Sequence, residues 1–210
     1  MISAALLKSI DNKTFAVTKD SGIADYMRSI RGLVYGLWRG SVDQFTFVDD
    51  MGLAISRGFT RAWTAGAASV GVQPSEITLA EKRALRQQIN SELGFLLPFA
   101  EAIERGSKAN RGLLRNVLRR AEMWINRYNG IYNQAKLMAA EDAKMEWQVG
   151  ETEHCVDCAR LNGRVYRAST WRDYNIRPQM ATLECKGFRC QCRFMQTDKP
   201  CTPGHPPRIG

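Results

Sequence analysis

The chain has 210 residues, and 30 lysines and arginines against 21 aspartates and glutamates give it a formal net charge of +9. This length suffices for one sizeable domain and a small appendage, and no run of about 20 uncharged apolar residues predicts a membrane span. Residues 1–8 lack the pattern of a signal peptide. The spread of basic charge fits either an ordinary solvated surface or sequence-independent contact with a polyanion.

After an N-terminal arm over residues 1–20, residues 21–145 show the apolar spacing of α-helices. Steps of three and four over residues 23–38 place one apolar stripe on a first helix. Ser21 is the predicted N-cap of this helix, and Gly40 is the predicted stop.

A second helix is predicted to begin at Ser41, where Gln44 would complete a capping box. Its apolar stripe runs to Trp63 and continues into small residues. Each glycine inside a helix weakens it by about 1 kcal/mol relative to alanine, so we expect this helix to depend on tertiary packing. The glycines concerned are Gly52, Gly58 and Gly66.

Thr78 and Glu81 form the predicted capping box of a third helix, which extends to Ile103. Pro98 lies inside this helix. Because proline donates no backbone hydrogen bond and crowds the preceding turn, we expect a kink or break near residues 94–97.

Asn110 is the predicted cap of a fourth helix, the longest and most regular one, which runs to Ala139. Four apolar stripes with short connections predict a helical bundle or antiparallel hairpins. Three arginines spaced four apart would share one face of this helix: Arg111, Arg115 and Arg119. Such a row is either a solvated exterior or a docking stripe for DNA phosphates or an acidic partner.

Five of the six cysteines fall within residues 155–192, inside a predicted Cys-rich module over residues 146–197. A two-residue spacer lets both thiolates of a pair face one point, so separate segments can converge on one tetrahedral ion. The candidate metal ligands are Cys155, Cys158, Cys185, Cys190 and Cys192. The cofactor that this pattern predicts is a single structural zinc ion.

A closed zinc site takes four thiolates at about 2.3 Å each, and we favour Cys155, Cys158, Cys185 and either Cys190 or Cys192. Disulfides and free buried thiols are the alternatives, although a reducing cytoplasm favours metal ligation. Cys201 lies outside the cluster as a spare thiol. We interpret His154 as an exposed loop residue or an alternative ligand, because adjacent residues rarely form a nucleophile and its base.

The module should combine short strands with a zinc-knuckle turn. Residues 147–150 are β-like, residues 161–166 predict a tight Asn-Gly turn between strands, and residues 188–194 predict a returning strand that carries Cys190 and Cys192. The proline- and glycine-rich tail over residues 198–210 should extend along a surface or stay mobile.

The expected fold class is therefore mainly α, with an N-terminal helical bundle or hairpins and a small Cys-rich, zinc-bound α+β module at the C-terminus. The chain lacks a phosphate-binding glycine loop, a His-Glu-x-x-His motif and a Gly-x-Ser-x-Gly motif. Cysteine-only zinc sites are structural, because the ligands leave no position open to water. We therefore expect no enzymatic activity.

Residues 147–194 resemble the F-like minor head proteins of Mu-type tailed phages, also called head morphogenesis proteins. The matching pattern is Trp147-x-x-Gly150, Cys155-x-x-Cys158-x-x-Leu161-x-Gly163-x-Val165-Tyr166 and Cys190-x-Cys192-Arg193. The family commonly ends in His-Pro-x-Cys-Arg-Cys, whereas this chain has no His-Pro there and has Gln191 between the last two cysteines. Cys185 stands upstream, where we infer that it substitutes as a ligand.

The resemblance implies a minor capsid protein that is made in the host cytoplasm and enters the virion near the portal during head assembly. Its implied partners are the portal or the major capsid protein, with several copies in each particle. We expect no contact with a membrane, since no segment predicts a membrane span. Contact with packaged DNA would be independent of DNA sequence. The alternative hypothesis is a zinc-ribbon regulatory protein that binds nucleic acid and uses its helices to dimerise.

Overall fold

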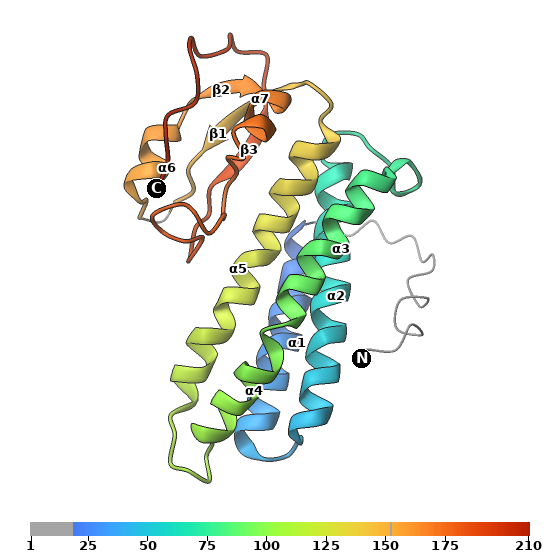
Figure 1. Cartoon of the computed structure of the whole chain (residues 1–210), viewed down its shortest axis with the longest axis vertical. Coiled ribbons are helices and arrows are strands. Elements are labelled where there is room, and N and C mark those ends of the chain that lie inside the picture. The colour runs from blue at the N-terminus through green and yellow to red at the C-terminus, as the bar shows by residue number, and fades with distance from the viewer. Residues whose placement is uncertain (1–18, 152) are drawn as a thin grey trace.

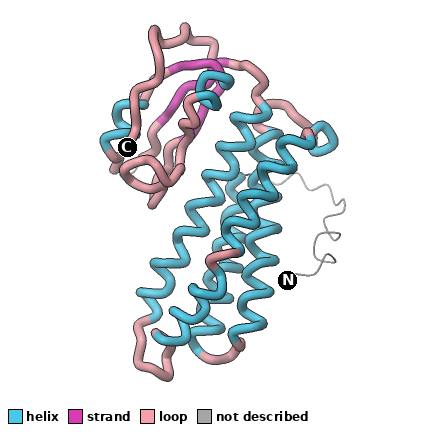
Figure 2. Tube along the Cα trace, viewed as in Figure 1, coloured by secondary structure: helices cyan, strands magenta, loops and turns pink. Residues whose placement is uncertain are grey.

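A computed structural model describes residues 19–151 and 153–210. A long helical bundle carries a small three-stranded module at one end (Figure 1), and the strands all lie in that module (Figure 2). The predicted mainly helical fold with a Cys-rich C-terminal module is confirmed at this level. The bundle consists of α1 (Lys19–Arg39), α2 (Gln44–Ala68), α3 (Leu79–Leu93), α4 (Leu96–Arg105) and α5 (Leu114–Ala139).

Helices α1, α3 and α4 run in one direction along the bundle, and α2 and α5 run in the other (Figure 1). Their apolar stripes meet in one core in which aromatic rings pack closely. The ring centroids of Phe99 and Trp124 lie 4.7 Å apart, and those of Tyr26 and Tyr128 lie 5.5 Å apart. This packing gives each amphipathic helix a partner for its apolar face.

The starts of the first two helices differ from the prediction. α1 begins at Lys19, so Ser21 lies inside the helix and the predicted N-cap there is wrong. Asp43 caps α2 by accepting a hydrogen bond from the Thr46 backbone N–H at 2.9 Å, so the predicted start at Ser41 with a box to Gln44 is also wrong. The Ser41 hydroxyl instead donates to the carbonyl of Gly36.

The predicted capping box at α3 and the predicted break after it are both confirmed. Thr78 Oγ1 accepts from the Glu81 N–H at 3.2 Å, and Glu81 Oε2 accepts from the Thr78 N–H at 2.9 Å. α3 ends at Leu93 and α4 begins at Leu96, so Pro98 occupies the first turn of a new helix. Backbone N–H groups in a first turn have no acceptor within the helix, so proline costs little there.

The connection from α4 to α5 is longer than the sequence predicted. Asn110 does not cap α5, which begins at Leu114. The side-chain amide of Asn110 instead donates a hydrogen bond to the carbonyl of Glu104 at 2.8 Å, at the C-terminal end of α4. Arg111 lies in this connection with a φ of 58°. The prediction that Arg111 shares a helical face with Arg115 and Arg119 is therefore wrong, although those two arginines do lie on α5.

In the module, the strands β1 (Lys144–Gln148), β2 (Val165–Arg167) and β3 (Arg193–Gln196) form an antiparallel sheet in the order β2-β1-β3. The helix α6 (Val156–Leu161) precedes β2, and α7 (Ala168–Asp173) follows it. The turn at Gly163, with a φ of 74°, thus joins a helix to a strand, and the prediction of a turn between two strands is wrong.

The predicted strand over residues 188–194 is also wrong, because β3 begins only at Arg193. Lys186 and Arg189 both have a φ of 50°, which is a left-handed conformation that an extended strand does not contain. Cys190 and Cys192 therefore lie in the loop that leads into β3.

Aromatic rings fill the core of the module. Trp147, from the central strand, packs edge-on against Phe194 with centroids 5.6 Å apart, and Trp171 meets Tyr166 edge-on at 5.0 Å. The Trp171 indole N–H donates to the carbonyl of Met145 at 2.9 Å, so α7 is hydrogen-bonded to the sheet that it covers.

The C-terminal tail lies along this module, in agreement with the first of the two predicted alternatives. Thr202 exchanges two hydrogen bonds with Val165, its N–H donating to the carbonyl at 2.8 Å. The carbonyl of His205 accepts from the Tyr166 hydroxyl at 3.1 Å, and Ile209 packs against the module core.

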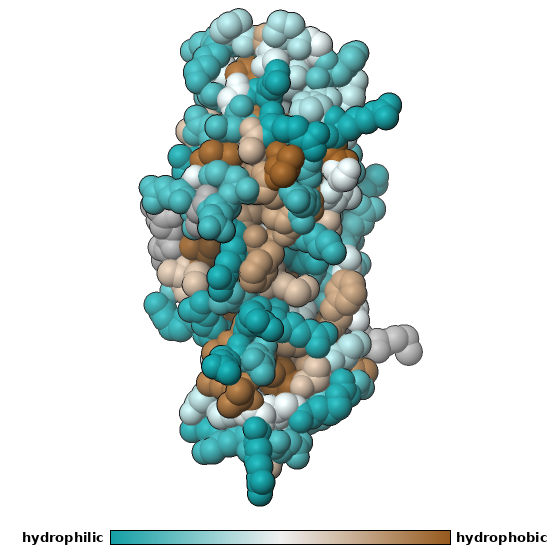
Figure 3. Space-filling model, turned by 90° about the vertical axis from the view of Figure 1, so that its left-hand side faces the viewer, coloured by the Kyte–Doolittle hydropathy of each residue, from teal (hydrophilic) through white to brown (hydrophobic). Residues whose placement is uncertain are grey.

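Hydrophilic side chains cover most of the face shown in Figure 3, and smaller apolar patches lie between them. Within the part of the chain that the structure describes, the helices are too short or too polar to cross a bilayer. The predicted arm over residues 1–20 falls outside the described residues except for its last two, which begin α1.

Candidate metal centre

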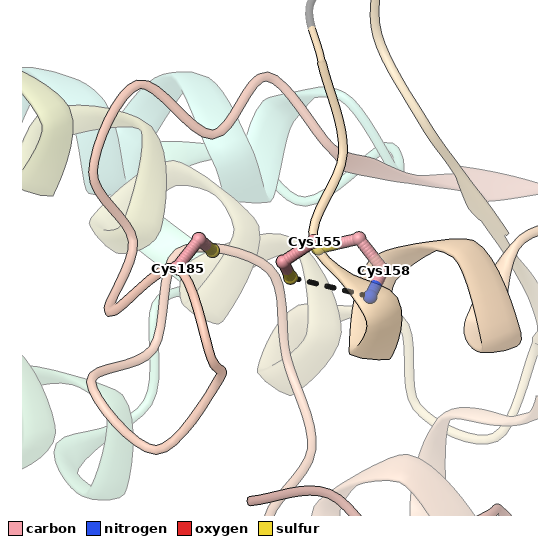
Figure 4. A group of neighbouring side chains, drawn as sticks. All are labelled: Cys155, Cys158 and Cys185. Atoms are coloured by element: carbon pink, nitrogen blue, oxygen red, sulfur yellow. Dashed lines mark hydrogen bonds between the residues drawn. The ribbon is translucent and has the colours of Figure 1, made fainter.

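Two segments of the module supply the cysteine cluster. Cys155 and Cys158 come from the start of α6, and Cys185, Cys190 and Cys192 come from the loop between α7 and β3. Cys155 caps α6, since its Sγ accepts a hydrogen bond from the Cys158 N–H at 3.5 Å. Figure 4 shows this bond and places Cys185, from the other segment, beside the pair. The helix cap thus fixes the first two sulfurs near one another.

The five thiols form two overlapping groups of three. Cys155, Cys158 and Cys185 form one, and Cys158, Cys190 and Cys192 form the other; within each group the sulfurs all lie within 4.8 Å of one another. Cys158 belongs to both groups, and its Sγ lies 4.0 Å from that of Cys190. A disulfide needs about 2.05 Å, and all six cysteines are free thiols. The predicted convergence of the five cysteines is confirmed as a cluster that could hold a metal ion.

The spacing of the sulfurs suits a tetrahedral ion. Four sulfurs at about 2.3 Å from zinc lie about 3.8 Å from each other. Each group of three approaches this spacing, since its sulfurs lie within 4.8 Å of one another, and a fourth sulfur from the other group would have to move toward the ion. Cys158, Cys190 and Cys192 are buried, and Cys155 and Cys185 are half-buried. A donor set made only of thiols favours soft or borderline ions such as zinc over calcium or magnesium.

The thiols influence one another's protonation. Hydrogen bonds from the Cys158 and Cys192 thiols lower the pKa of Cys190 to about 2, and the same contact with Cys190 raises the pKa of Cys158. Burial raises the pKa of Cys185 to about 12. A bound cation would favour the thiolate form of its ligands, because its positive charge stabilises them, and would release their protons.

Asp157, which sequence analysis did not single out, holds the two cysteine segments together. Its carboxylate is buried and accepts from the Glu184 backbone N–H at 2.9 Å and from the Arg160 guanidinium at 3.1 Å. Glu184 in return accepts from the Val156 N–H at 2.8 Å. The sequence could have indicated this role, because Asp157 lies inside the Cys-x-x-Cys spacer and a carboxylate there faces the same loop as the thiols.

Gln179 is a second residue that sequence analysis missed, and its buried amide contacts the segment that carries Cys190 and Cys192. Its sequence context gives no sign of this role. His154 and Cys201 are exposed and belong to neither group of thiols.

The predicted contact residues lie apart from the cysteine segments in the chain. Arg115 and Arg119 are exposed on the first half of α5, and Arg111 is exposed in the preceding loop. Their contact with a nucleic acid or a protein partner stays a prediction.

Comparison of the chain with models of known protein families, with curated proteins and with solved structures finds no match.

Proposed function

We propose that the cysteine cluster binds one structural zinc ion and that the protein is a minor structural component of a tailed-phage head. The bundle would dock on the portal or the major capsid protein, and the zinc-stabilised module would complete the contact. The observation that carries this proposal is the arrangement of the motif residues in one compact unit.

The zinc part of the proposal rests on donor chemistry and on the small size of the module. Its three strands have five, three and four residues, and its two helices have six residues each. So little regular structure buries a limited apolar area, and a metal commonly supplies the missing stability.

We infer that Cys155, Cys158 and Cys185 supply three of the ligands and that Cys190 supplies the fourth. Cys190 Sγ lies 4.0 Å from Cys158 Sγ, and it would move toward Cys155 and Cys185 when the ion binds. Cys192 then remains as a buried fifth thiol beside the ion.

The phage part of the proposal rests on the motif that resembles the head morphogenesis proteins. Its large apolar members are buried: Trp147, Leu161 and Tyr166 are at most 3% exposed. They form the apolar core against which the cysteine segments fold. The motif therefore describes one folding unit, in which some residues pack and others gather thiols.

Two measurements on the intact protein test the proposal. Elemental analysis of the purified chain should find about one zinc ion per chain. When the chain is produced together with the other proteins of its genome, it should sediment with assembled heads and stay bound through washing. Absence from the particle fraction would contradict the phage assignment.

A binding assay separates the regulatory alternative from the head protein. A head protein should bind duplex DNA weakly, with strong dependence on salt and without preference for sequence. A regulator should bind one short duplex at least about a thousandfold more tightly than unrelated DNA. Tight sequence-specific binding would therefore favour the zinc-ribbon regulator.

A further inference from the structure

The side chain of Gln179 organises the segment that carries the last two cysteines. Its amide nitrogen donates to the carbonyl of Cys190 at 2.9 Å and to the carbonyl of Cys192 at 2.6 Å. The same nitrogen lies 3.6 Å from Cys190 Sγ as a hydrogen-bond donor. One buried amide thus fixes the backbone on both sides of Gln191 and points an N–H at a candidate ligand sulfur.

Asn133 connects this arrangement to the helical bundle. It lies on α5, is fully buried, and donates through Nδ2 to Gln179 Oε1 at 2.8 Å. Its Oδ1 accepts from the backbone N–H of Phe194 at 3.1 Å, at the start of β3. A buried amide that lost these partners would cost about 1–3 kcal/mol, so the network holds the loop against α5.

Two glycines show how closely the chain packs around Gln179. A side chain at Gly187, in the loop between Cys185 and Cys190, would overlap the Gln179 carbonyl oxygen. Gly130 on α5 faces the Gln179 side chain, and a Cβ there would lie 3.4 Å from Gln179 Cβ. Loop, glutamine and helix therefore form one tightly packed junction in which none can shift alone.

We propose that Gln179 and Asn133 are positioning residues of the metal site and that they couple metal binding to the docking of the module on α5. This inference rests on the proposed zinc ion. Gln179 fixes the direction of Cys190 and stabilises its thiolate through the N–H···S bond. Because groups that orient metal ligands raise metal affinity, and because linkage is reciprocal, a bound ion should also tighten the contact with α5.

The first test compares two identical chemical changes in the full-length protein. Gln179→Glu keeps the shape of the side chain but removes the amide donor, and Gln191→Glu makes the same change at an exposed position between the same two cysteines. Zinc affinity is measured by competition with a chromogenic chelator, and cobalt(II) is used as a spectroscopic probe of the thiolate ligands. We expect Gln179→Glu to weaken metal binding about 10- to 100-fold and to shift the cobalt–thiolate absorption bands, while Gln191→Glu leaves both unchanged.

The second test follows the coupling to α5. Amide hydrogen exchange over residues 129–137 should slow when zinc is added to the wild-type protein, and this slowing should be lost in Gln179→Glu. Asn133→Asp, which removes the donor to Gln179 but retains an acceptor for Phe194, should weaken zinc binding in the same direction. If Gln179→Glu shows no cooperative thermal transition, the affinity and spectrum of Asn133→Asp decide the question.

The outcomes separate this inference from the zinc proposal. If the wild-type protein binds neither zinc nor cobalt, both fail. If it binds zinc and the variants at Gln179 and Asn133 match Gln191→Glu in affinity and spectrum, the zinc proposal stands and the positioning role is overturned.

Discussion

Gly66 of α2 lies directly against the backbone carbonyl of Tyr132 in α5. A methyl group at Gly66 would overlap that carbonyl oxygen and would lie 2.9 Å from the Cβ of Ala135. The glycine that weakens α2 as an isolated helix therefore permits close approach of two long helices of the bundle. Loss of helix propensity at this position is offset by tertiary packing.

Replacing Gly66 with alanine should destabilise the protein, although alanine is the better helix former. We expect a net loss of about 1–3 kcal/mol in the free energy of unfolding, because overpacking forces the helices apart. Gly32→Ala is the matched control, since Gly32 is exposed on α1 and a Cβ there meets nothing within 4 Å. That control should gain up to about 1 kcal/mol. Equal urea midpoints for the two variants would show that α2 and α5 are not in close contact at Gly66.

The cysteine shared by both groups of thiols should matter most for metal content. Cys158→Ser should reduce bound zinc from about one ion per chain to near zero, and Cys201→Ser should leave it unchanged, because Cys201 is exposed and outside the cluster. Removal of the ion with a strong chelator should unfold the module before the bundle in the wild-type protein. Full zinc content in Cys158→Ser would contradict the proposed ligand set.

Asp157→Asn should loosen the junction between α6 and the loop that carries Cys185. The carboxylate accepts hydrogen bonds at both oxygens, and an amide offers only one acceptor, so we expect a loss of about 1–3 kcal/mol. Asp173→Asn makes the same change at an exposed position on α7 and should have little effect. The measurement is thermal unfolding at matched zinc content, and equal melting temperatures would remove the bridging role of Asp157.

The buried carboxyl of Glu92 on α3, paired with the half-exposed Arg127 on α5, predicts a pH dependence of stability. Burial raises the pKa of Glu92 above 4.5, even though the Arg127 guanidinium lies 2.8 Å away. The native state therefore holds this proton more tightly than the unfolded state. Stability contributed by the protonated carboxyl is present below pH 4.5 and is lost as the pH rises through the higher native pKa.

Glu92→Gln carries no proton to lose, so its stability should not fall in that interval. The melting temperature of the wild-type protein relative to Glu92→Gln should decrease from pH 4 to the native pKa and then level off. Glu101→Gln, at an exposed position on α4, should track the wild-type protein. A constant difference between wild type and Glu92→Gln across this range would show that Glu92 has an ordinary pKa.

Arg115 and Arg119 form an exposed pair one turn apart on α5 and are the remaining part of the predicted arginine row. Reversal of both to glutamate should weaken association with DNA or with assembled heads, most strongly at low salt. The matched control reverses Arg83 and Arg86 on α3, which are also exposed and give the same change in net charge. Equal losses for the two double variants would assign the effect to net charge alone.

Features that depend only on residues close together in the chain could be predicted from the sequence. Apolar steps of three and four placed the bundle helices, and the box between Thr78 and Glu81 lies within a single turn. The break before Pro98 has a local cause as well. Cysteine spacing predicted the cluster, because short spacers limit where two thiols can point.

At several helix ends the sequence offers more than one capping residue, and the predicted caps there are wrong. Ser41, Asp43 and Asn110 are all good capping residues, and only the folded chain decided that Asp43 caps α2 while Asn110 closes α4. The strand predicted over residues 188–194 is wrong because Arg189 has a left-handed conformation, and Gly187, also left-handed, packs directly against the Gln179 backbone.

By itself the sequence determined the helices and the gathering of thiols, since both follow from periodicity and short spacing. Only the tertiary structure decided which side chains support those thiols. Asn133 and Gln179 stand 46 residues apart and meet at 2.8 Å, and no local pattern encodes that contact. The physical reason is that removing a side-chain amide from water costs free energy unless the amide gains hydrogen bonds inside the protein. Here the hydrogen-bond partners come from distant parts of the chain, and the packing of α5 against the module brings them together.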